Sequence, residues 1–238
     1  MYESALFRAL FYCKIDDCYY GHRHYYRRMN MTLLLGDIVP NFTADSTIGT
    51  INFHEWLGES WGFFFSHPAD FTPVCTTELG RTSQLSAQFA ERNVKSVGLS
   101  TDTSEQHLAW LKDVNETQNT CVEFPVIADT DLTVAKLYGM LHPEQSATAT
   151  VRSVFIIDPN KKLRLTMTYP MTVGRNFNEI LRVIDSLQTG DANSIATPAD
   201  WQPGDLAIIP PSISNEEADK KFPQGYEVIK PYLRTVKI

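Results

Sequence analysis

The sequence predicts an α/β protein in which helices flank a central mixed sheet. Short apolar runs alternate with helical segments from Leu33 to about Gly190, an order typical of βαβ units. Trp61–Phe65 is one of these runs and indicates a buried strand. Asp158–Lys161 has hairpin chemistry between two apolar runs, which adds an antiparallel pair. With 238 residues, 43% of them hydrophobic, the chain can bury a large core.

Capping residues and glycines set the ends of the other predicted elements. In order, these are a helix from Thr72 through Phe89, a strand over Val94–Leu99, a helix opened by the capping box Thr103–Gln106, a strand over Phe124–Ala128, a helix ending at Gly139, strands over Val154–Ile157 and Leu163–Thr168, and a helix capped by Asn176 and Glu179 that stops at Gly190.

Composition divides the chain into three parts: an N-terminal extension over 1–31, a main domain over 32–190 and a C-terminal segment over 191–238. The extension crowds Tyr, His and Arg without a sustained period, so we expect it to be disordered, an organellar presequence or the product of an upstream start codon. The last segment holds six of the thirteen prolines, which predicts an arm with little regular structure. Its apolar anchors are Trp201, Ile208, Ile209, Phe222 and Tyr232.

Charge and cysteine content exclude several classes of protein. The net charge of −7 argues against nucleic acid or an acidic membrane surface as a partner. No apolar run approaches the roughly 18 residues of a membrane span. Four cysteines are too few for a secreted disulfide scaffold of this size, so we expect a soluble protein in a reducing compartment, the cytoplasm, or the mitochondrion if residues 1–31 are a presequence. A zinc site is not predicted, because the spacing is tight and no folded context surrounds the candidate ligands Cys13, Cys18, His22 and His24.

Cys75 is the residue most suited to chemistry. Thr72 followed by Pro73 indicates a helix start, with Thr72 as N-cap and Pro73 at the first helical position. Cys75 then falls in the first turn, where unpaired N–H groups and the helix dipole stabilise a thiolate, the reactive form of cysteine. On this local pattern alone, an inert buried cysteine is an equal alternative.

The surrounding motif, Pro68-x-x-x-Thr72-x-x-Cys75, resembles the active-site signature of the peroxiredoxins, and within them the one-cysteine (peroxiredoxin 6 type) subgroup. The resemblance covers residues 33–238. It is carried by further segments: Leu35–Phe42, Cys75–Gly80, Val151–Ile156, Gly174–Asn176 and Ala196–Trp201.

This resemblance implies a thioredoxin-like fold with a small C-terminal dimerisation domain, and a thiol-dependent peroxidase that acts on hydrogen peroxide and organic, including phospholipid, hydroperoxides. The implied catalytic set is Cys75, Thr72, Arg152 and Pro68. Glu78 and Arg175 are expected to orient Arg152, and His67 is expected to tune the thiolate or to pack against an aromatic ring. No metal or bound cofactor is implied.

Attack on peroxide leaves Cys75 as a sulfenic acid, which must be reduced again. No cysteine follows Cys121, so the resemblance implies an external thiol, glutathione delivered with a glutathione transferase, and a homodimer. Cys121 itself is either a fortuitous resolving thiol or a bystander.

Two other functions are alternatives. Phospholipase A2 activity, known in the subgroup, would use Ser60 within Gly58–Gly62 together with His54, but Asn160 stands where an acid is expected, and an amide cannot stabilise an imidazolium. We favour ordinary structural roles for Ser60 and His54. The remaining alternative is a holdase or peroxide sensor that passes oxidation of Cys75 to a partner protein.

Overall fold

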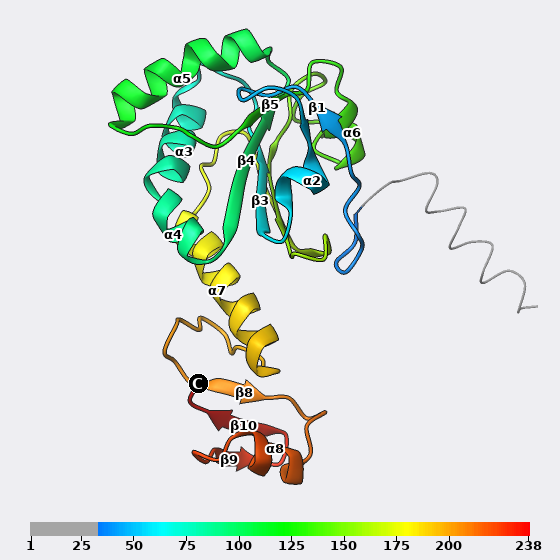
Figure 1. The fold of residues 1–238 in the computed structure, drawn as a ribbon, viewed down its shortest axis with the longest axis vertical. Coiled ribbons are helices and arrows are strands. Elements are labelled where there is room, and N and C mark those ends of the chain that lie inside the picture. Colours follow the sequence, from blue (N-terminus) through cyan, green and yellow to red (C-terminus); the bar gives the residue numbers. More distant parts are fainter. Residues whose placement is uncertain (1–32) are drawn as a thin grey trace, which may run out of the picture.

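The structure, a computed structural model, describes residues 33–238 and contains a five-stranded mixed sheet between two layers of helices (Figure 1). Across the sheet, the strands are β5 (Val126–Ala128), β4 (Val94–Ser100), β3 (Trp61–Ser66), β6 (Arg152–Ile157) and β7 (Leu163–Tyr169). The central strand β3 runs parallel to β4 and antiparallel to β6, and β6 and β7 form the predicted hairpin. The predicted α/β class with a mixed sheet is confirmed.

The two faces of the sheet bury two separate apolar clusters. Along β3, Phe63 and Phe65 enter one cluster and Phe64 enters the other, as the period of two in a strand requires. The helices over the first face are α3 (Pro73–Gln84), α4 (Ser86–Glu91), α5 (Ser104–Gln118) and α7 (Phe177–Asn193). Over the second face lie α2 (Phe53–Leu57), α6 (Thr133–Leu137) and the short pair β1 (Thr43–Ala44) and β2 (Ile51–Asn52).

Burial of its side chains is the main stabilisation of β3. All six of its residues are buried, and burying one Phe side chain contributes roughly 1.5–3 kcal/mol. The carboxyl end of β3 is therefore a rigid starting point for the loop that follows it.

The helix predicted to run from Thr72 through Phe89 is wrong as a single element. The backbone of Leu85 leaves the helical region, with φ −95° and ψ 5°, and separates α3 from α4. Leu85 and Phe89 both lie in the cluster on the first face. The break re-aims α4 so that these two side chains reach the same core, which a helical pattern read along the chain does not reveal.

Gly190 does not end the last long helix, as predicted, because α7 continues to Asn193 and ends at Ser194, whose φ is 50°. A Cβ atom on Gly190 would lie 3.2 Å from the carbonyl oxygen of Ile195. The N–H of Ile195 donates to the carbonyl of Gly190 at 3.2 Å. A glycine fits at position 190 because the chain that follows α7 turns back and approaches its backbone closely, and not because the helix ends there.

The C-terminal segment, predicted to have little regular structure, instead forms a small sheet with one helix. Its strands are β8 (Ala207–Ile209), β10 (Leu233–Val236) and β9 (Glu227–Lys230), in that spatial order, and its helix is α8 (Asn215–Lys221). Pro210 and Pro231 stand directly after β8 and β9, where a missing N–H costs no ladder bond. The prolines therefore mark strand ends and not an absence of strands.

A core of its own holds this C-terminal unit, and α7 connects it to the main body (Figure 1). Ile209 and Phe222 are buried in that core and Trp201 is buried beside α7, whereas Tyr232 is 70% exposed. The guanidinium of Arg182 on α7 donates to the carbonyl of Trp201 at 3.3 Å. The predicted anchors thus divide between buried and solvent-facing positions.

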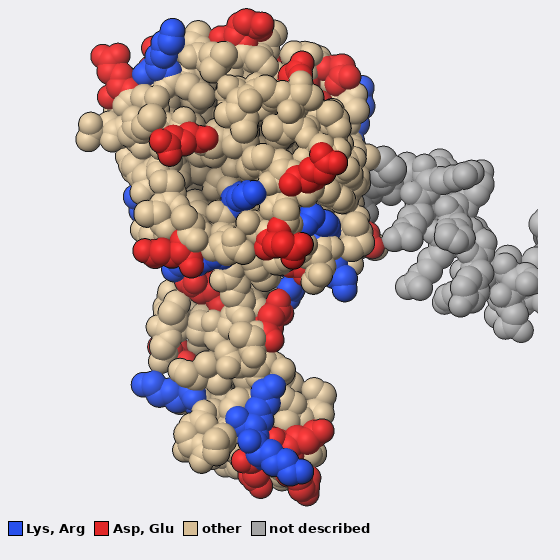
Figure 2. Space-filling model, in the orientation of Figure 1, with Lys and Arg blue, Asp and Glu red and all other residues tan. Residues whose placement is uncertain are grey.

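No helix within residues 33–238 is long and apolar enough to cross a membrane. In the view of Figure 2, acidic and basic side chains are interspersed over the main body. The predicted extension over 1–31, with the candidate zinc ligands Cys13, Cys18, His22 and His24, lies outside the described residues.

Candidate active site

The loop between β3 and α3 positions Cys75. β3 ends at Ser66 and α3 begins at Pro73, so Cys75 is the third residue of the helix. Thr72 is the N-cap, as predicted, with an extended backbone at φ −113° and ψ 145°. Its hydroxyl donates to the carbonyl of Ala69 at 2.9 Å and accepts no hydrogen bond from the helix. The N–H groups of the first turn are therefore left for an anion beside Cys75.

Arg152 contacts the Cys75 sulfur directly. It is the first residue of β6, and its Nη1 lies 3.3 Å from Sγ of Cys75. The same Nη1 donates to Oε2 of Glu78 at 2.7 Å. Nε and Nη2 both donate to the carbonyl of Met171, at 3.0 and 2.7 Å. All three guanidinium nitrogens are engaged, so the group is fixed while one nitrogen faces the sulfur.

Glu78 binds both arginines. It lies one turn after Cys75 on α3, and its carboxylate accepts from the backbone N, Nε and Nη2 of Arg175 at 2.8, 3.0 and 2.6 Å. Arg175 also donates through Nη1 to the carbonyl of Ser66 at 2.9 Å. Burial alone would raise the pKa of Glu78, but Arg175 and Arg152 outweigh that effect and hold the pKa below its ordinary value.

The cluster of Glu78, Arg152 and Arg175 has a net positive charge beside a buried sulfur. It contains one carboxylate and two guanidinium groups, all three side chains at most 3% exposed. Cys75 itself is 0% exposed. In such a poorly screened environment, a cationic group stabilises a thiolate and a developing oxyanion strongly. The arrangement therefore suits a nucleophilic cysteine that attacks a small oxygen compound.

His67 and Pro68 precede these residues in the loop, and both are buried. The Nε2 of His67 lies 2.9 Å from Oδ1 of Asp70, and its ring centroid lies 5.1 Å from that of Trp110. Burial is the largest effect on the pKa of His67 and lowers it. His67 thus packs against an aromatic ring, and no hydrogen bond joins its side chain to Cys75 within the described part of the chain.

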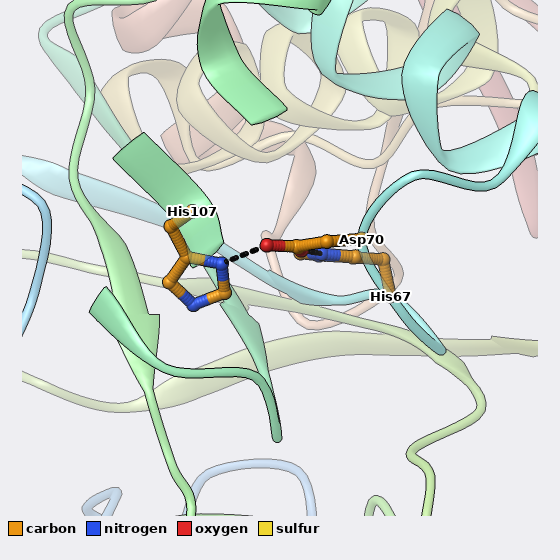
Figure 3. A group of neighbouring side chains, drawn as sticks. All are labelled: His67, Asp70 and His107. Atoms are coloured by element: carbon orange, nitrogen blue, oxygen red, sulfur yellow. Dashed lines mark hydrogen bonds and ion pairs between the residues drawn. The ribbon is translucent and has the colours of Figure 1, made fainter. Parts of the chain in front are cut away.

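Asp70 and His107 are neighbours of this site that the sequence reasoning missed. Oδ2 of Asp70 lies 2.6 Å from Nδ1 of His107 on α5, and the carboxylate stands between two imidazoles (Figure 3). Asp70 lies inside the Pro68–Cys75 motif, so one signal was present: an acid in an otherwise apolar loop needs a buried partner. The sequence offered nothing to identify His107 as that partner, because it lies 37 residues away.

A model of the AhpC/TSA family matches residues 35–166, more than half of the chain. The chain belongs to the AhpC/TSA family. A second model, of the C-terminal domain of 1-Cys peroxiredoxin, matches residues 186–225 and places the chain in the one-cysteine peroxiredoxins. The predicted family and subgroup are confirmed, and with them the thioredoxin-like fold and the class of enzyme, a thiol-dependent peroxidase.

Several relatives cover most of the chain. The chain is 54% identical over 202 residues to the 1-Cys peroxiredoxin of Dictyostelium discoideum, and this match covers 85% of the chain and 84% of the relative. It is 53% identical over 201 residues to peroxiredoxin-6 of Mus musculus, over 81% and 90% of the two chains. A solved structure of the yeast mitochondrial 1-Cys peroxiredoxin, whose thiol resolving proceeds via glutathione/thioredoxin systems, is 51% identical with a TM-score of 0.83, over 87% and 100%.

Ser60 and His54, the residues of the phospholipase alternative, are not bonded to each other. The hydroxyl of Ser60 donates to Oδ1 of Asn93 at 2.9 Å. Nε2 of His54 lies 3.0 Å from the carbonyl of Val39. Each side chain is satisfied by a partner that has no role in a catalytic triad.

An acid for such a triad is also missing from the hairpin. Asn160 is exposed. The carboxylate of Asp158 accepts from the backbone N of Lys162 at 3.0 Å and from Nη1 of Arg164 at 3.3 Å. Within residues 33–238, no hydrogen bond links either residue to His54.

Cys121 differs from Cys75 in being exposed, and neither forms a disulfide. Its carbonyl accepts a hydrogen bond from Ser83 Oγ at 2.7 Å. Ser83 lies eight residues beyond Cys75 on α3, which corresponds to about 12 Å along the helix axis. Cys121 is therefore held near the opposite end of α3 from Cys75.

Proposed function

We propose that Cys75 reduces hydrogen peroxide and organic hydroperoxides, phospholipid hydroperoxides included. The thiolate attacks one oxygen of the O–O bond, an S–O bond forms, and the other oxygen leaves and takes up a proton as water or an alcohol. Cys75 becomes a sulfenic acid. Arg152 stabilises both the thiolate and the departing oxygen, and the Thr72 hydroxyl holds the peroxide beside the sulfur.

One observation carries this proposal: a fully engaged guanidinium of Arg152 stands 3.3 Å from a buried sulfur. Glu78 and Arg175 are the residues that orient it, and buried Pro68 shields the loop from water. A cation fixed before the reaction loses no energy to reorganisation when negative charge develops.

An external thiol returns the sulfenic acid to the thiol, and we assign glutathione, delivered with a glutathione transferase. Two cysteines can form a disulfide only when their Cα atoms lie within about 7 Å, whereas Cys121 is tied to Ser83, two turns along α3 from Cys75. The yeast relative, resolved via glutathione/thioredoxin systems, supports the same choice of reductant.

The test compares wild type with Cys75→Ser and Cys121→Ser in rapid-mixing measurements of hydrogen peroxide consumption, with glutathione and glutathione transferase present. We expect Cys75→Ser to abolish turnover and Cys121→Ser to retain it. A Cys75–Cys121 disulfide in non-reducing mass spectrometry after one equivalent of peroxide would refute the external-thiol mechanism. A single oxidation event without turnover would identify a peroxide sensor or holdase instead.

For assembly, we propose a homodimer in the cytoplasm, with the mitochondrion as the alternative because the yeast relative is mitochondrial. We also propose the division into 1–31, 32–190 and 191–238, because the C-terminal unit has a separate core.

An exposed strand of the C-terminal unit supports the homodimer. All four residues of β9 are exposed, among them Val228 and Ile229, and an apolar strand in solvent favours a partner surface. Light scattering tests the homodimer by comparing the molar mass of wild type with that of Val228→Lys, which we expect to be shifted toward the monomer. A monomeric wild type would contradict the proposed dimer.

A further inference from the structure

A buried His–Asp–His cluster holds the loop that precedes Cys75. Asp70 lies five residues before Cys75, and its side chain is 1% exposed between the fully buried side chains of His67 and His107 (Figure 3). Its Oδ1 lies 2.9 Å from Nε2 of His67, and its Oδ2 lies 2.6 Å from Nδ1 of His107. Every oxygen of this carboxylate therefore has an imidazole partner.

Hydrogen-bond chemistry assigns the protons in the cluster. Nε2 of His107 lies 3.1 Å from the carbonyl of Ile127, which only accepts, so Nε2 carries a proton. Burial alone would raise the pKa of Asp70, but hydrogen bonds from His107 and His67 outweigh it and keep the pKa low. Both ring nitrogens of His107 thus have a hydrogen-bond partner, Nδ1 the carboxylate of Asp70 and Nε2 the carbonyl of Ile127. Nε2 of His67 faces the other carboxylate oxygen of Asp70, and burial lowers the pKa of His67.

Two further hydrogen bonds join α5 and the residues just before it to the segment around Cys75. The backbone N of Asp70 donates to Oδ2 of Asp102, just before α5, at 2.9 Å. One turn after His107, Nε1 of Trp110 donates to Oγ1 of Thr76 at 3.1 Å. Asp70 and Thr76 stand on either side of Cys75 in the sequence, so the hydrogen bonds to Asp102 and Trp110 bracket the reactive residue.

The bracketed loop needs such support because its backbone is strained. Phe71 directly follows Asp70 and has a φ of 53°, a region that a bulky L-residue enters only when its surroundings impose it. The ring of Phe71 is 55% exposed, and its centroid lies 6.4 Å from that of Trp110 on α5. The next residue is Thr72, the cap beside Cys75, and its position follows from that of Asp70.

We propose that His107 is a positioning residue of the peroxidase reaction, acting through its hydrogen bond with Asp70 to hold Thr72 and Cys75 in the geometry that captures peroxide. This inference rests on the proposed function of Cys75. Among the described residues no hydrogen bond joins His107 to Cys75, so its effect reaches the sulfur through the loop. His107 lies on α5 and is separate from the Glu78–Arg152–Arg175 cluster.

The same three side chains are a conceivable metal-binding group, since their facing atoms lie within 4.8 Å of one another. Two ligands of a tetrahedral zinc ion stand about 3.3 Å apart, whereas the His107–Asp70 contact is 2.6 Å and the His67–Asp70 contact is 2.9 Å. Those are hydrogen-bond lengths. The geometry therefore favours protons between these groups over a metal ion.

The experiment measures the rate constant for oxidation of Cys75 by hydrogen peroxide, and separately the rate of recycling by glutathione, in full-length His107→Phe, Asp70→Asn and the double variant. We expect His107→Phe to slow the oxidation step about tenfold to a hundredfold, the range for a small displacement of reacting groups. Asp70→Asn should slow it less, because an amide can rebuild neutral hydrogen bonds. The double variant should be no slower than His107→Phe, since the two residues act as one unit.

The matched control for Asp70→Asn is Asp113→Asn, which also replaces an aspartate by an asparagine but at an exposed position of α5. It should leave both the oxidation of Cys75 and its recycling by glutathione unchanged. Folding is checked by near-ultraviolet circular dichroism, and His107→Gln, which keeps one donor to Asp70, replaces His107→Phe if that variant does not fold. A folded His107 variant with wild-type oxidation overturns the proposal. So do additive losses in the double variant, or stoichiometric zinc in purified wild type that is lost in Asp70→Asn. If wild type itself fails to consume peroxide, the proposed function fails first.

Discussion

Cys75 and Ser60 stand at opposite ends of the same strand. Ser60 precedes β3 and Cys75 follows it in the first turn of α3, and the six-residue strand itself is about 20 Å long. At the carboxyl end, Arg152 from β6 contacts the sulfur, and Glu78 on α3 binds both Arg152 and Arg175. At the amino end, Ser60 bonds to Asn93 and His54 to Val39, and the two side chains do not meet.

A reactive site is therefore distinguished by the hydrogen bonds and ion pairs that join its side chains, and not by residue type alone. Around Cys75, Arg152 binds Glu78, Glu78 binds Arg175, and each is oriented by the next. Around Ser60, the serine hydroxyl bonds to an amide side chain and His54 Nε2 to a backbone carbonyl, and neither partner activates a nucleophile. A lipase-like run of residues in sequence carries little information until a histidine and an acid are seen to face the serine.

Among variants at the two ends of β3, a replacement of Arg152 should have the largest effect, on the rate at which Cys75 is oxidised. We expect Arg152→Ala to slow oxidation of Cys75 by hydrogen peroxide about 10²- to 10³-fold, as for loss of one preorganised donor to a developing oxyanion. Arg152→Lys keeps the charge but not the fork that spans Glu78 and Met171, and should recover only part of the rate. Rapid-mixing kinetics checks both variants; wild-type rates in Arg152→Ala would remove Arg152 from the mechanism.

Glu78→Gln should lower the free energy of unfolding by about 3–5 kcal/mol, because it leaves two buried guanidinium groups without their carboxylate. The matched control is Glu179→Gln, which removes the carboxylate of the Glu179–Arg182 pair, where the side chains are 37% and 21% exposed. That change should cost under about 1 kcal/mol. Urea titrations of the three proteins measure the difference, and equal losses in both variants would contradict it.

The same carboxylate makes stability depend on pH. The folded-state pKa of Glu78 lies below the ordinary value of 4.5, so its contribution is fully present above that pH and is lost as pH falls through the folded value. Wild type should therefore lose more stability than Glu78→Gln between neutral pH and the acidic range below 4.5. Urea titrations in a pH series test this; parallel curves for the two proteins would show that Glu78 titrates normally.

Ser60→Ala should have the smallest effect. It removes one partly exposed hydrogen bond to Asn93, worth about 0.5–1.5 kcal/mol, and should leave peroxide reduction unchanged. Any hydrolysis of a phospholipid substrate should be the same in wild type, Ser60→Ala and Cys75→Ser. Hydrolysis that disappears only in Ser60→Ala would show that the amino end of β3 is a second active site.

Local signals predicted the elements around Cys75 well. A run of buried aromatic residues indicated β3, and Thr72 with Pro73 located the start of α3. Those features depend on residues a few positions apart, where capping and strand periodicity act. The break at Leu85 and the role of Gly190 depend instead on a distant core and a returning chain, so the local pattern misplaced both helix boundaries.

The partners of Cys75 were harder to predict than Cys75 itself, the nucleophile we propose. Glu78 and Arg175 were found only through the family resemblance, because 97 residues separate them and an arginine in isolation indicates a solvated surface. Asp70 and His107 were missed even so. Their pairing depends on burial, a property of the assembled fold that neither residue shows by itself.

The difference in exposure between the two described cysteines has a consequence for chemical proteomics. Cys75 is 0% exposed and Cys121 is exposed, so we expect a bulky electrophilic probe to label Cys121 faster than Cys75 in the folded protein. A survey that ranks cysteines by labelling would then rank the residue we assign to the chemistry below its bystander. Slow labelling by a large probe and fast oxidation by a hydroperoxide are expected in the same sulfur.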